Sequence, residues 1–210
     1  SLDAGQISLR ERVVADGPRG SAPESRGVGL VFQDLALFPH LDVAGNVGFG
    51  LHRLARAERE PRVRETLALL DLADYAGRFP HELSGGQQQR AAIARTLVQN
   101  ARVILADEPI ASLDPESSRR VMDTLAQINR SRKVAVVVSL HQVDVALRYC
   151  PRVVALRHGK VVYDGPSAEL TPAMLRDLYG SELSELLPEY TPQVLPMPGL
   201  APLSRQACAA

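Results

Sequence analysis

The sequence predicts an α/β fold in which a parallel sheet is flanked by helices and carries a helical subdomain. Three short apolar runs, at 28–32, 103–106 and 134–140, are typical of buried strands. A segment with apolar residues at helical spacing follows the second run. A strand followed by a helix is the recurring unit of α/β folds, so these observations favour that class.

Composition agrees with one globular domain that has a subdomain. The chain has 210 residues, with 24 Lys and Arg against 24 Asp and Glu, and 45% of its residues are hydrophobic. A fibrous repeat and disorder throughout are excluded, and zero net charge gives no electrostatic footprint for nucleic acid. The longest strongly apolar run, 134–140, is far shorter than the ~20 residues of a membrane-spanning helix. Cys150 and Cys208 form no disulfide framework, which fits a reducing compartment such as the cytoplasm.

The first half of the chain is expected to hold strands and two surface helices. A turn and a strand-like segment occupy 3–7, and the run 28–32 predicts a buried strand that ends at Gln33. The stretch 46–70 is rich in charge and predicts two surface helices. Its apolar positions recur at helical spacing: Val63, Leu67 and Leu70.

The second half predicts further strands and helices. Asp114 is expected to cap a helix that has Pro115 in its first turn. The apolar face of that helix is Val121, Met122, Leu125 and Ile128. A hairpin is expected around His158-Gly159, and a short helix at 172–179. The last segment, 188–210, is rich in proline and is expected to be a disordered tail.

Two adjacent carboxylates, Asp107 and Glu108, follow the apolar run 103–106. They are expected at the carboxyl edge of the sheet, where open α/β sheets bind ligands. One carboxylate of such a pair can hold Mg²⁺ while its neighbour orients or deprotonates a water. The pair by itself also fits a solvated strand end, so both interpretations stay open at this point.

A second group of residues, Leu83 to Arg90, reads LSGGQQQR and precedes a helical stretch, 91–98. Ser84 is well placed as the helix N-cap, and Gly85 and Gly86 expose backbone N–H groups at the positive end of the helix. A phosphate fits such a site. An ordinary capped turn explains Ser-Gly-Gly, but it does not explain the three glutamines and the arginine that follow.

Taken together, these residues resemble the ATP-binding cassette (ABC) ATPases. LSGGQQQR resembles the signature motif of that family and 103–108 its Walker B strand, while Ser112-Leu113-Asp114 resembles its D-loop. His141 resembles the switch histidine, and Gln33 resembles the Q-loop glutamine. All of these motifs occur in the order of the family. The resemblance implies a P-loop NTPase-like core with a helical subdomain.

The resemblance also implies roles for single residues, with ATP and Mg²⁺ as the ligands. Asp107 would hold Mg²⁺, Glu108 would be the general base, and His141 would contact the γ-phosphate. Gln33 would sense the metal and the water and link the site to the permease. The residues expected at the ATP of a partner subunit are Ser84, Gly85, Gly86 and Gln87, with Asp114 in the D-loop.

The glycine-rich loop GxxxxGK[ST] that such a site also needs does not occur in these 210 residues. Its nearest counterpart, Gly159-Lys160, is followed by Val161 and has Val154 in place of the first glycine. In the family that loop precedes the Q-loop glutamine. We therefore expect an amino-terminally truncated ATPase that by itself binds ATP very weakly.

The two halves of the chain resemble different branches of the family. Segments 31–41 and 46–51 are similar to ATPases that import ferric iron or polyamines. Segments 104–117, 121–125, 140–144 and 146–150 are similar to ATPases that import phosphonate, and this match is longer. We expect phosphonate or a similar oxyanion as the cargo, with iron(III) or polyamine as the alternative. A DNA-repair or translation ATPase and a non-hydrolysing remnant are further alternatives.

The expected organisation has four parts. Residues 1–33 are the remainder of the N-terminal core, 34–98 the helical subdomain with the signature motif, 99–187 the C-terminal core, and 188–210 the tail. The resemblance implies a dimer of cassettes joined through the signature and the D-loop. It also implies integral membrane permease subunits, a periplasmic substrate-binding protein reached indirectly, and a peripheral place on the cytoplasmic face of the inner membrane.

Overall fold

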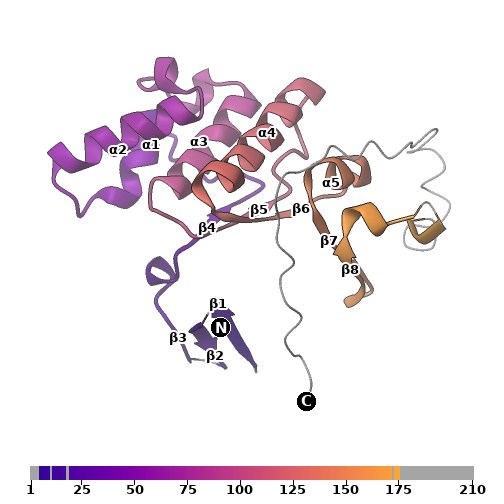
Figure 1. Cartoon of the computed structure of the whole chain (residues 1–210). Helices are drawn as coiled ribbons and strands as arrows, with labels where there is room; N and C mark the ends of the chain where they lie inside the picture. The colour runs from indigo at the N-terminus through magenta and orange to yellow at the C-terminus, as the bar shows by residue number, and fades with distance from the viewer. Residues whose placement is uncertain (1–4, 10, 18, 172, 176–210) are drawn as a thin grey trace. The chain divides into compact units, whose positions relative to one another are not determined.

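A computed structural model describes residues 5–9, 11–17, 19–171 and 173–175. The chain divides into two compact units, one ending at His141 and the other beginning at Gln142. Figure 1 shows the elements of each unit.

The first unit is built on a parallel sheet of three strands. They are β4 (Val28–Val31), β5 (Val103–Asp107) and β6 (Ala135–Ser139), in the spatial order β4-β5-β6. Both pairings are parallel, and their registers align Val31 with Ala106 and Ala106 with Val138. The three predicted strands are therefore confirmed, and so is the α/β fold with a parallel sheet flanked by helices, but the prediction that all three strands are buried is wrong for β6, which has no fully buried residue.

Two long helices, α3 (Gly85–Leu97) and α4 (Pro115–Arg132), lie along this sheet (Figure 1). Helix α3 is almost wholly buried, with Ala91 through Ala94 inaccessible to solvent. The predicted apolar face of α4 is buried as well: Val121, Met122, Leu125 and Ile128. On β5 the side chains of Ile104 and Ala106 are buried, which places the core between the sheet and these helices.

The other face of the sheet is apolar and exposed. Leu30, Leu105 and Val137 stand in register across the three strands, and their exposed fractions are 40%, 37% and 57%. Parallel sheets are normally covered on both faces. No described residue of this unit buries that row of side chains.

The helical region between β4 and α3 contains α1 (Val43–Gly48) and α2 (Arg56–Leu69) (Figure 1). Helix α2 confirms one of the two surface helices predicted within 46–70, whereas α1 begins before that stretch and is largely buried. The predicted apolar positions, Val63, Leu67 and Leu70, are all buried. Single-turn 3-10 helices occur at Pro23–Ser25, Phe49–Leu51, Ala73–Tyr75, Pro80–Glu82 and Ser167–Glu169.

A small antiparallel sheet precedes β4. It consists of β1 (Gln6–Leu9), β2 (Arg12–Asp16) and β3 (Arg19–Gly20), in that spatial order. The sequence predicted only the first of these strands. The other two are short, and β2 buries only Val14, so they lack the apolar run that marks a buried strand.

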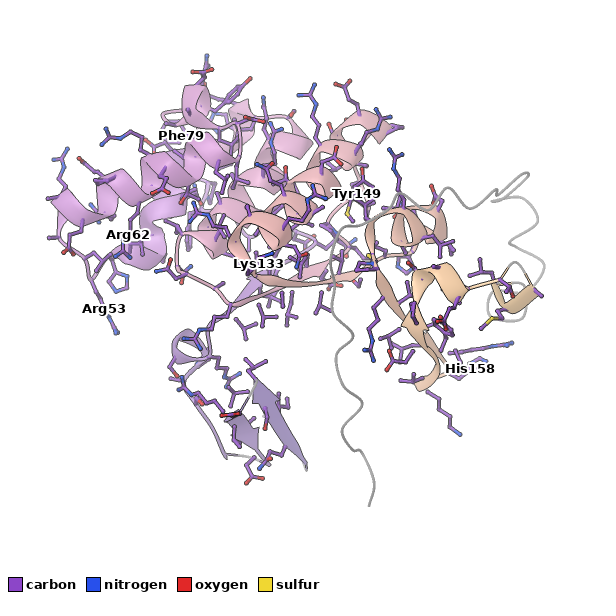
Figure 2. The ribbon with its side chains drawn as sticks, viewed as in Figure 1. Arg53, Arg62, Phe79, Lys133, Tyr149 and His158 are labelled. Atoms are coloured by element: carbon purple, nitrogen blue, oxygen red, sulfur yellow. The ribbon has the colours of Figure 1, made fainter. Side chains whose placement is uncertain are left out.

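The second unit contains α5 (Val143–Tyr149) and the hairpin β7 (Arg152–Arg157) and β8 (Lys160–Pro166). The turn at His158-Gly159, at the tip of the hairpin in Figure 2, has φ of 49° and 74°. Two consecutive positive φ angles suit the right-handed twist of a hairpin, so the predicted turn is confirmed. The sequence did not predict α5.

The core of the second unit surrounds Leu170 and Leu175, against which Val143, Leu147, Val153 and Tyr163 pack. Residues 173–175 are helical, as expected for part of the short helix at 172–179. The rest of that helix, and the segment 188–210, lie outside the described residues. No helix among the residues with a described position combines the length and the apolar character needed to cross a membrane.

Candidate functional site

The carboxylates at the end of β5 are tied to the neighbouring strand by one hydroxyl group. Asp107 is the last residue of β5 and pairs in register with Ser139 of β6. The Ser139 hydroxyl donates to Asp107 Oδ1 at 2.6 Å and accepts from the Glu108 N–H at 2.9 Å. Ser139 thus fixes the side chain of one carboxylate residue and the backbone of the next.

Glu108 adopts a left-handed backbone with φ of 44°, which is unusual for a residue with a side chain. Its Oε1 lies 2.6 Å from Nε2 of His141, which follows β6 by two residues. The His141 side chain is 82% exposed and that of Glu108 is 26% exposed. The two groups form a hydrogen-bonded pair that is open to solvent on the histidine side.

Gln33 belongs to the same edge of the sheet. It lies two residues beyond the end of β4, which is parallel to β5 with Val31 opposite Ala106. Because parallel strands end at one edge, Gln33 follows β4 where Asp107 and Glu108 end β5. The Gln33 side chain is exposed.

The second group of predicted residues lies at the start of α3. Ser84 is the N-cap, which confirms its predicted place: its hydroxyl accepts from the Gln87 N–H at 3.3 Å, and Gln87 Oε1 accepts from the Ser84 N–H at 2.8 Å. Reciprocal bonds of this kind form a capping box. A Cβ at Gly86 would lie 2.9 Å from the Ser117 Cβ, and one at Gly85 would lie 3.0 Å from Leu113 Cδ2. The two glycines therefore let α3 begin against the start of α4.

Helix α4 begins in the same place and is capped in a similar way. Oδ1 of Asp114 accepts from the N–H groups of Glu116 and Ser117, each at 3.0 Å. This confirms the predicted cap. Hydrogen bonds from Ser117 lower the pKa of the Asp114 carboxyl below its usual value.

A cavity of about 270 Å³ lies where the two helices begin. Its lining comprises Ser84, Gly86, Gln87, Arg90, Asp114, Glu116, Ser117 and Arg120. Arg90 is only 8% exposed, burial lowers its pKa, and its Nε has no hydrogen-bond partner among the described residues. The N-termini of two helices and the Arg90 guanidinium bring positive charge to this cavity, and the Asp114 and Glu116 carboxylates bring negative charge.

The metal that the resemblance implies also fits the residues present. Mg²⁺ in nucleotide sites takes one or two protein carboxylates and fills its other positions with phosphate oxygens and water. No group of three or more His, Cys, Asp or Glu side chains able to hold a metal occurs within the described ranges. The Asp107 carboxylate at the strand end is a ligand of the kind that Mg²⁺ takes in such sites.

The predicted site residues thus fall into two clusters, one at the strand ends and one at the helix starts. The sequence patterns do not predict the contact of Ser139 with the strand-end carboxylates. They predict Arg90 only as part of the LSGGQQQR motif, not as a residue of the cavity. The position of Ser139 beside Asp107 depends on the register of β5 and β6, which a single sequence does not give. A signal for Arg90 was available, because it precedes the apolar run 91–94 on the buried side of the helix.

Comparison with known proteins agrees with this arrangement. The family model described as ABC transporter matches residues 1–111. The chain is 64% identical over 187 residues to the phosphonates import ATP-binding protein PhnC of Cupriavidus pinatubonensis, covering 83% of this chain and 66% of that protein. It is 59% identical over 203 residues to the phosphonates import ATP-binding protein PhnC 1 of Cupriavidus metallidurans, covering 90% of this chain and 72% of that protein.

Solved structures show the same fold. A dimeric ATP-binding cassette in a post-hydrolysis state, with ADP and phosphate bound, is 36% identical with a TM-score of 0.60, over 69% of this chain and 65% of that one. The protein cbiO1 of Clostridium perfringens, part of an ABC transporter complex, is 28% identical with a TM-score of 0.66, over 78% of this chain and 68% of that one. From its motifs, its sheet and these relatives, the chain belongs to the ABC transporter family as an ATP-binding cassette.

Proposed function

We propose that the chain is the ATP-hydrolysing subunit of a bacterial importer for phosphonate or a similar oxyanion. The observation that carries this proposal is the 64% identity to a protein named for phosphonates import. The chain spans 66% of the length of that relative, so the activity of the whole protein is part of the proposal.

The residues at the strand ends would carry the hydrolytic chemistry. Asp107, held by the Ser139 hydroxyl, would bind Mg²⁺ that arrives with ATP. Glu108, whose carboxylate is hydrogen-bonded to His141, would orient or deprotonate the attacking water. The bound metal would offset the negative charge of the phosphates during the transfer. Gln33, at the same sheet edge, would contact the metal and the water.

The cluster at the helix starts would act on a second copy of the chain. The cavity where α3 and α4 begin would receive the γ-phosphate of ATP bound to the partner subunit, with Ser84, Gly85, Gly86 and Gln87 as contacts and Asp114 nearby. Two cassettes would then close around two molecules of MgATP, and phosphate release would reopen them. Support comes from the relative that was solved as a dimer with ADP and phosphate.

The 210 residues contain no GxxxxGK[ST] loop, so we expect this chain by itself to bind MgATP very weakly. Isothermal titration calorimetry of the 210-residue chain with MgATP measures this directly. A dissociation constant in the micromolar range would contradict the expectation.

The helical region offers a docking surface for permease subunits. A groove of about 580 Å³ lies between α1 and α2. Its lining comprises Leu41, Ala44, Gly45, Gly48, Phe49, His52, Arg59, Glu60, Val63, Arg64, Leu67, Ala73 and Ala76. A mostly apolar groove suits a short helix of a membrane protein. The chain would then lie peripherally on the cytoplasmic face of the inner membrane and meet a periplasmic substrate-binding protein only through the permease.

An iron(III) or polyamine importer is the second candidate, since 31–41 and 46–51 resemble that branch. Against it, the alignment with the C. metallidurans relative covers 90% of the chain and therefore extends through these segments. Co-purification of the complete gene product with phosphonate-type and iron-type permeases separates the two. Binding to the phosphonate-type permease alone is expected, and the reverse pattern would reject phosphonate import.

A non-hydrolysing remnant is the third candidate. Its only motivation is the missing phosphate loop. The hydrogen-bonded network of Asp107, Ser139, Glu108 and His141 favours hydrolysis, because a subunit without activity has no need to keep that geometry.

A further inference from the structure

The segment that follows Gln33 is held in an unfavourable backbone conformation. Leu35 and Ala36 have φ of 62° and 47°, so two consecutive residues with side chains occupy the left-handed region. Such residues visit this region singly and at a cost, because Cβ approaches the following carbonyl oxygen. Within the turn, the Leu35 N–H donates to the Phe32 carbonyl at 3.0 Å, and the Ala36 N–H donates to the Asp34 carbonyl at 2.6 Å.

One side chain from a distant part of the sequence holds this turn. The Arg95 guanidinium donates through Nη1 to the Ala36 carbonyl at 2.5 Å and through Nη2 to the Leu35 carbonyl at 3.3 Å. Its Cζ also lies 5.6 Å from the centre of the Phe38 ring, within the range of a cation–π contact. Arg95 therefore touches both strained residues and the aromatic side chain that follows them.

Arg95 is half-buried, and burial lowers its pKa, yet no carboxylate pairs with it among the residues that the structure describes. A desolvated cation depends on the acceptors it has, which here are the two carbonyl groups. These carbonyls converge on one guanidinium only while Leu35 and Ala36 keep their left-handed conformation. The contact and the strained turn thus stabilise one another.

The far side of the segment is anchored independently. The Phe38 N–H donates to Asn46 Oδ1 at 2.7 Å, and Asn46 Nδ2 donates to the Phe38 carbonyl at 3.0 Å. Asn46 is buried in α1. The centres of the Phe38 and Phe49 rings lie 4.3 Å apart. The turn at Leu35 and Ala36 is therefore the part that depends on Arg95, while Phe38 depends on α1.

Arg95 also lies in the last turn of α3, the helix whose first turn carries the Ser84 cap and the glycine pair. Between the two ends, Ala91 through Ala94 are fully buried, so the helix is held along its length. A displacement at the start of α3 moves its last turn as well. Through the two hydrogen bonds, such a movement reaches the turn that begins immediately after Gln33.

We propose that Arg95 is a positioning residue for Gln33: by holding the turn at Leu35 and Ala36, it couples the position of the signature helix α3 to the glutamine. The functional part of this inference rests on the proposed function, since it takes Gln33 to act on the metal and the water of bound ATP. Lysine cannot replace arginine here, because a single ammonium lacks the planar fork that reaches two neighbouring carbonyls.

Hydrogen exchange of the 210-residue chain, resolved to single amides by NMR, tests the contact without ATP. In Arg95→Lys, the Leu35 and Ala36 amides are expected to exchange about tenfold faster, which corresponds to about 1.4 kcal/mol. The Phe38 amide should change little, because Asn46 holds it. Arg132→Lys, in the last turn of α4, is the matched control and should leave all three amides unchanged. Equal exchange in Arg95→Lys and the parent would overturn the proposal.

A second substitution tests whether strain is what Arg95 opposes. Glycine adopts positive φ without the Cβ penalty, so Ala36→Gly should slow exchange of the turn amides and restore much of the protection lost in Arg95→Lys. Ala36→Gly alone also keeps the test decisive if Arg95→Lys fails to fold. Faster exchange in Ala36→Gly than in the parent would contradict the proposal.

Steady-state ATP hydrolysis by the complete gene product tests whether Arg95 positions Gln33 for catalysis or only holds the turn at Leu35 and Ala36. Arg95→Lys should lower kcat about tenfold with KM for ATP within twofold, and Ala36→Gly should recover kcat in the double variant. Faster exchange with unchanged kcat would overturn the positioning role. If the parent does not hydrolyse ATP, the proposed function fails, while the exchange results still decide whether Arg95 holds the turn.

Discussion

Glu108 Oε1 and His141 Nε2 lie 2.6 Å apart, joining the residue after β5 to the loop after β6. The backbone of Glu108 reaches this position through a left-handed φ of 44°, and its N–H is held by the Ser139 hydroxyl. The pair therefore depends on two parallel strands keeping their register. It also depends on a serine that stands directly opposite Asp107.

The first prediction concerns Ser139. Replacing it with alanine removes the donor to the Asp107 carboxylate and the acceptor for the Glu108 N–H, so Asp107 loses the partner of its side chain and Glu108 loses the partner of its backbone. Partners of metal ligands typically contribute about 10- to 100-fold to activity or metal affinity. Ser139→Ala should lower ATP hydrolysis by that amount in the complete gene product and raise the Mg²⁺ concentration needed for half-maximal rate. Ser131→Ala, which removes a hydroxyl on α4, is the control. Equal rates in both variants would contradict the role of Ser139.

The second prediction uses two neighbours on β5 that face opposite sides of the sheet. Ile104 is fully buried, whereas Leu105 is 37% exposed. Ile104→Ala should lower the free energy of unfolding of the 210-residue chain by about 2–5 kcal/mol, because it leaves a cavity. Leu105→Ala should lower it by less than about 1 kcal/mol. Urea unfolding followed by circular dichroism measures both, and equal losses would mean that the two faces are equally covered.

The third prediction concerns the contact of β4 with α3. A Cβ at Gly29 would lie 2.7 Å from the Thr96 Cβ and 3.2 Å from the Ala101 Cβ. Gly29→Ala should therefore destabilise the chain by about 1–3 kcal/mol through overpacking. At Gly77 a Cβ would meet nothing within 4 Å, so Gly77→Ala should be neutral or slightly stabilising. Thermal unfolding of the two variants side by side gives the comparison, and a stable Gly29→Ala protein would show that α3 can move away from β4.

The fourth prediction is a pH dependence. Hydrogen bonds from Ser117 lower the pKa of Asp114 in the folded chain relative to the unfolded chain. A lowered folded pKa contributes stability that is present above the unfolded value, about 3.9, and is lost as the pH falls through the folded value. Asp114→Asn can still cap α4 but does not titrate. The stability advantage of the parent over this variant should thus shrink between pH 5 and pH 3 in urea titrations. A difference in the free energy of unfolding that stays constant over this pH range would contradict the lowered pKa of Asp114.

Much of the fold follows from local sequence patterns. The runs at 28–32, 103–106 and 134–140 are short and continuously apolar, which is typical of strands, and each became a strand of the parallel sheet. The caps at Ser84 and Asp114 are also local, since each side chain accepts from N–H groups within three residues. Hydrogen bonds between residues this close in the chain can be predicted from a single sequence.

What the sequence did not predict depends on distant contacts or on weak patterns. Helix α5 is short and has no fully buried residue, so it shows no strong apolar period. Strand β2 buries only Val14 and β3 has two residues, so neither contains a buried run. The roles of Ser139 and Arg95 arise from partners 31 to 60 residues away in the chain, and only the folded backbone brings them together.

In the proposed mechanism, Glu108 orients or deprotonates the water that attacks ATP, in a cassette whose dimer closes around MgATP. The most direct measurement compares steady-state hydrolysis by the complete gene product with that of Glu108→Gln, which keeps the shape of the side chain but cannot act as a base. We expect a loss of at least about 100-fold, the usual lower bound for removing a general base. We also expect a closed dimer that persists in MgATP during gel filtration. Hydrolysis near the parent rate would contradict the assignment of Glu108 and the mechanism built on it.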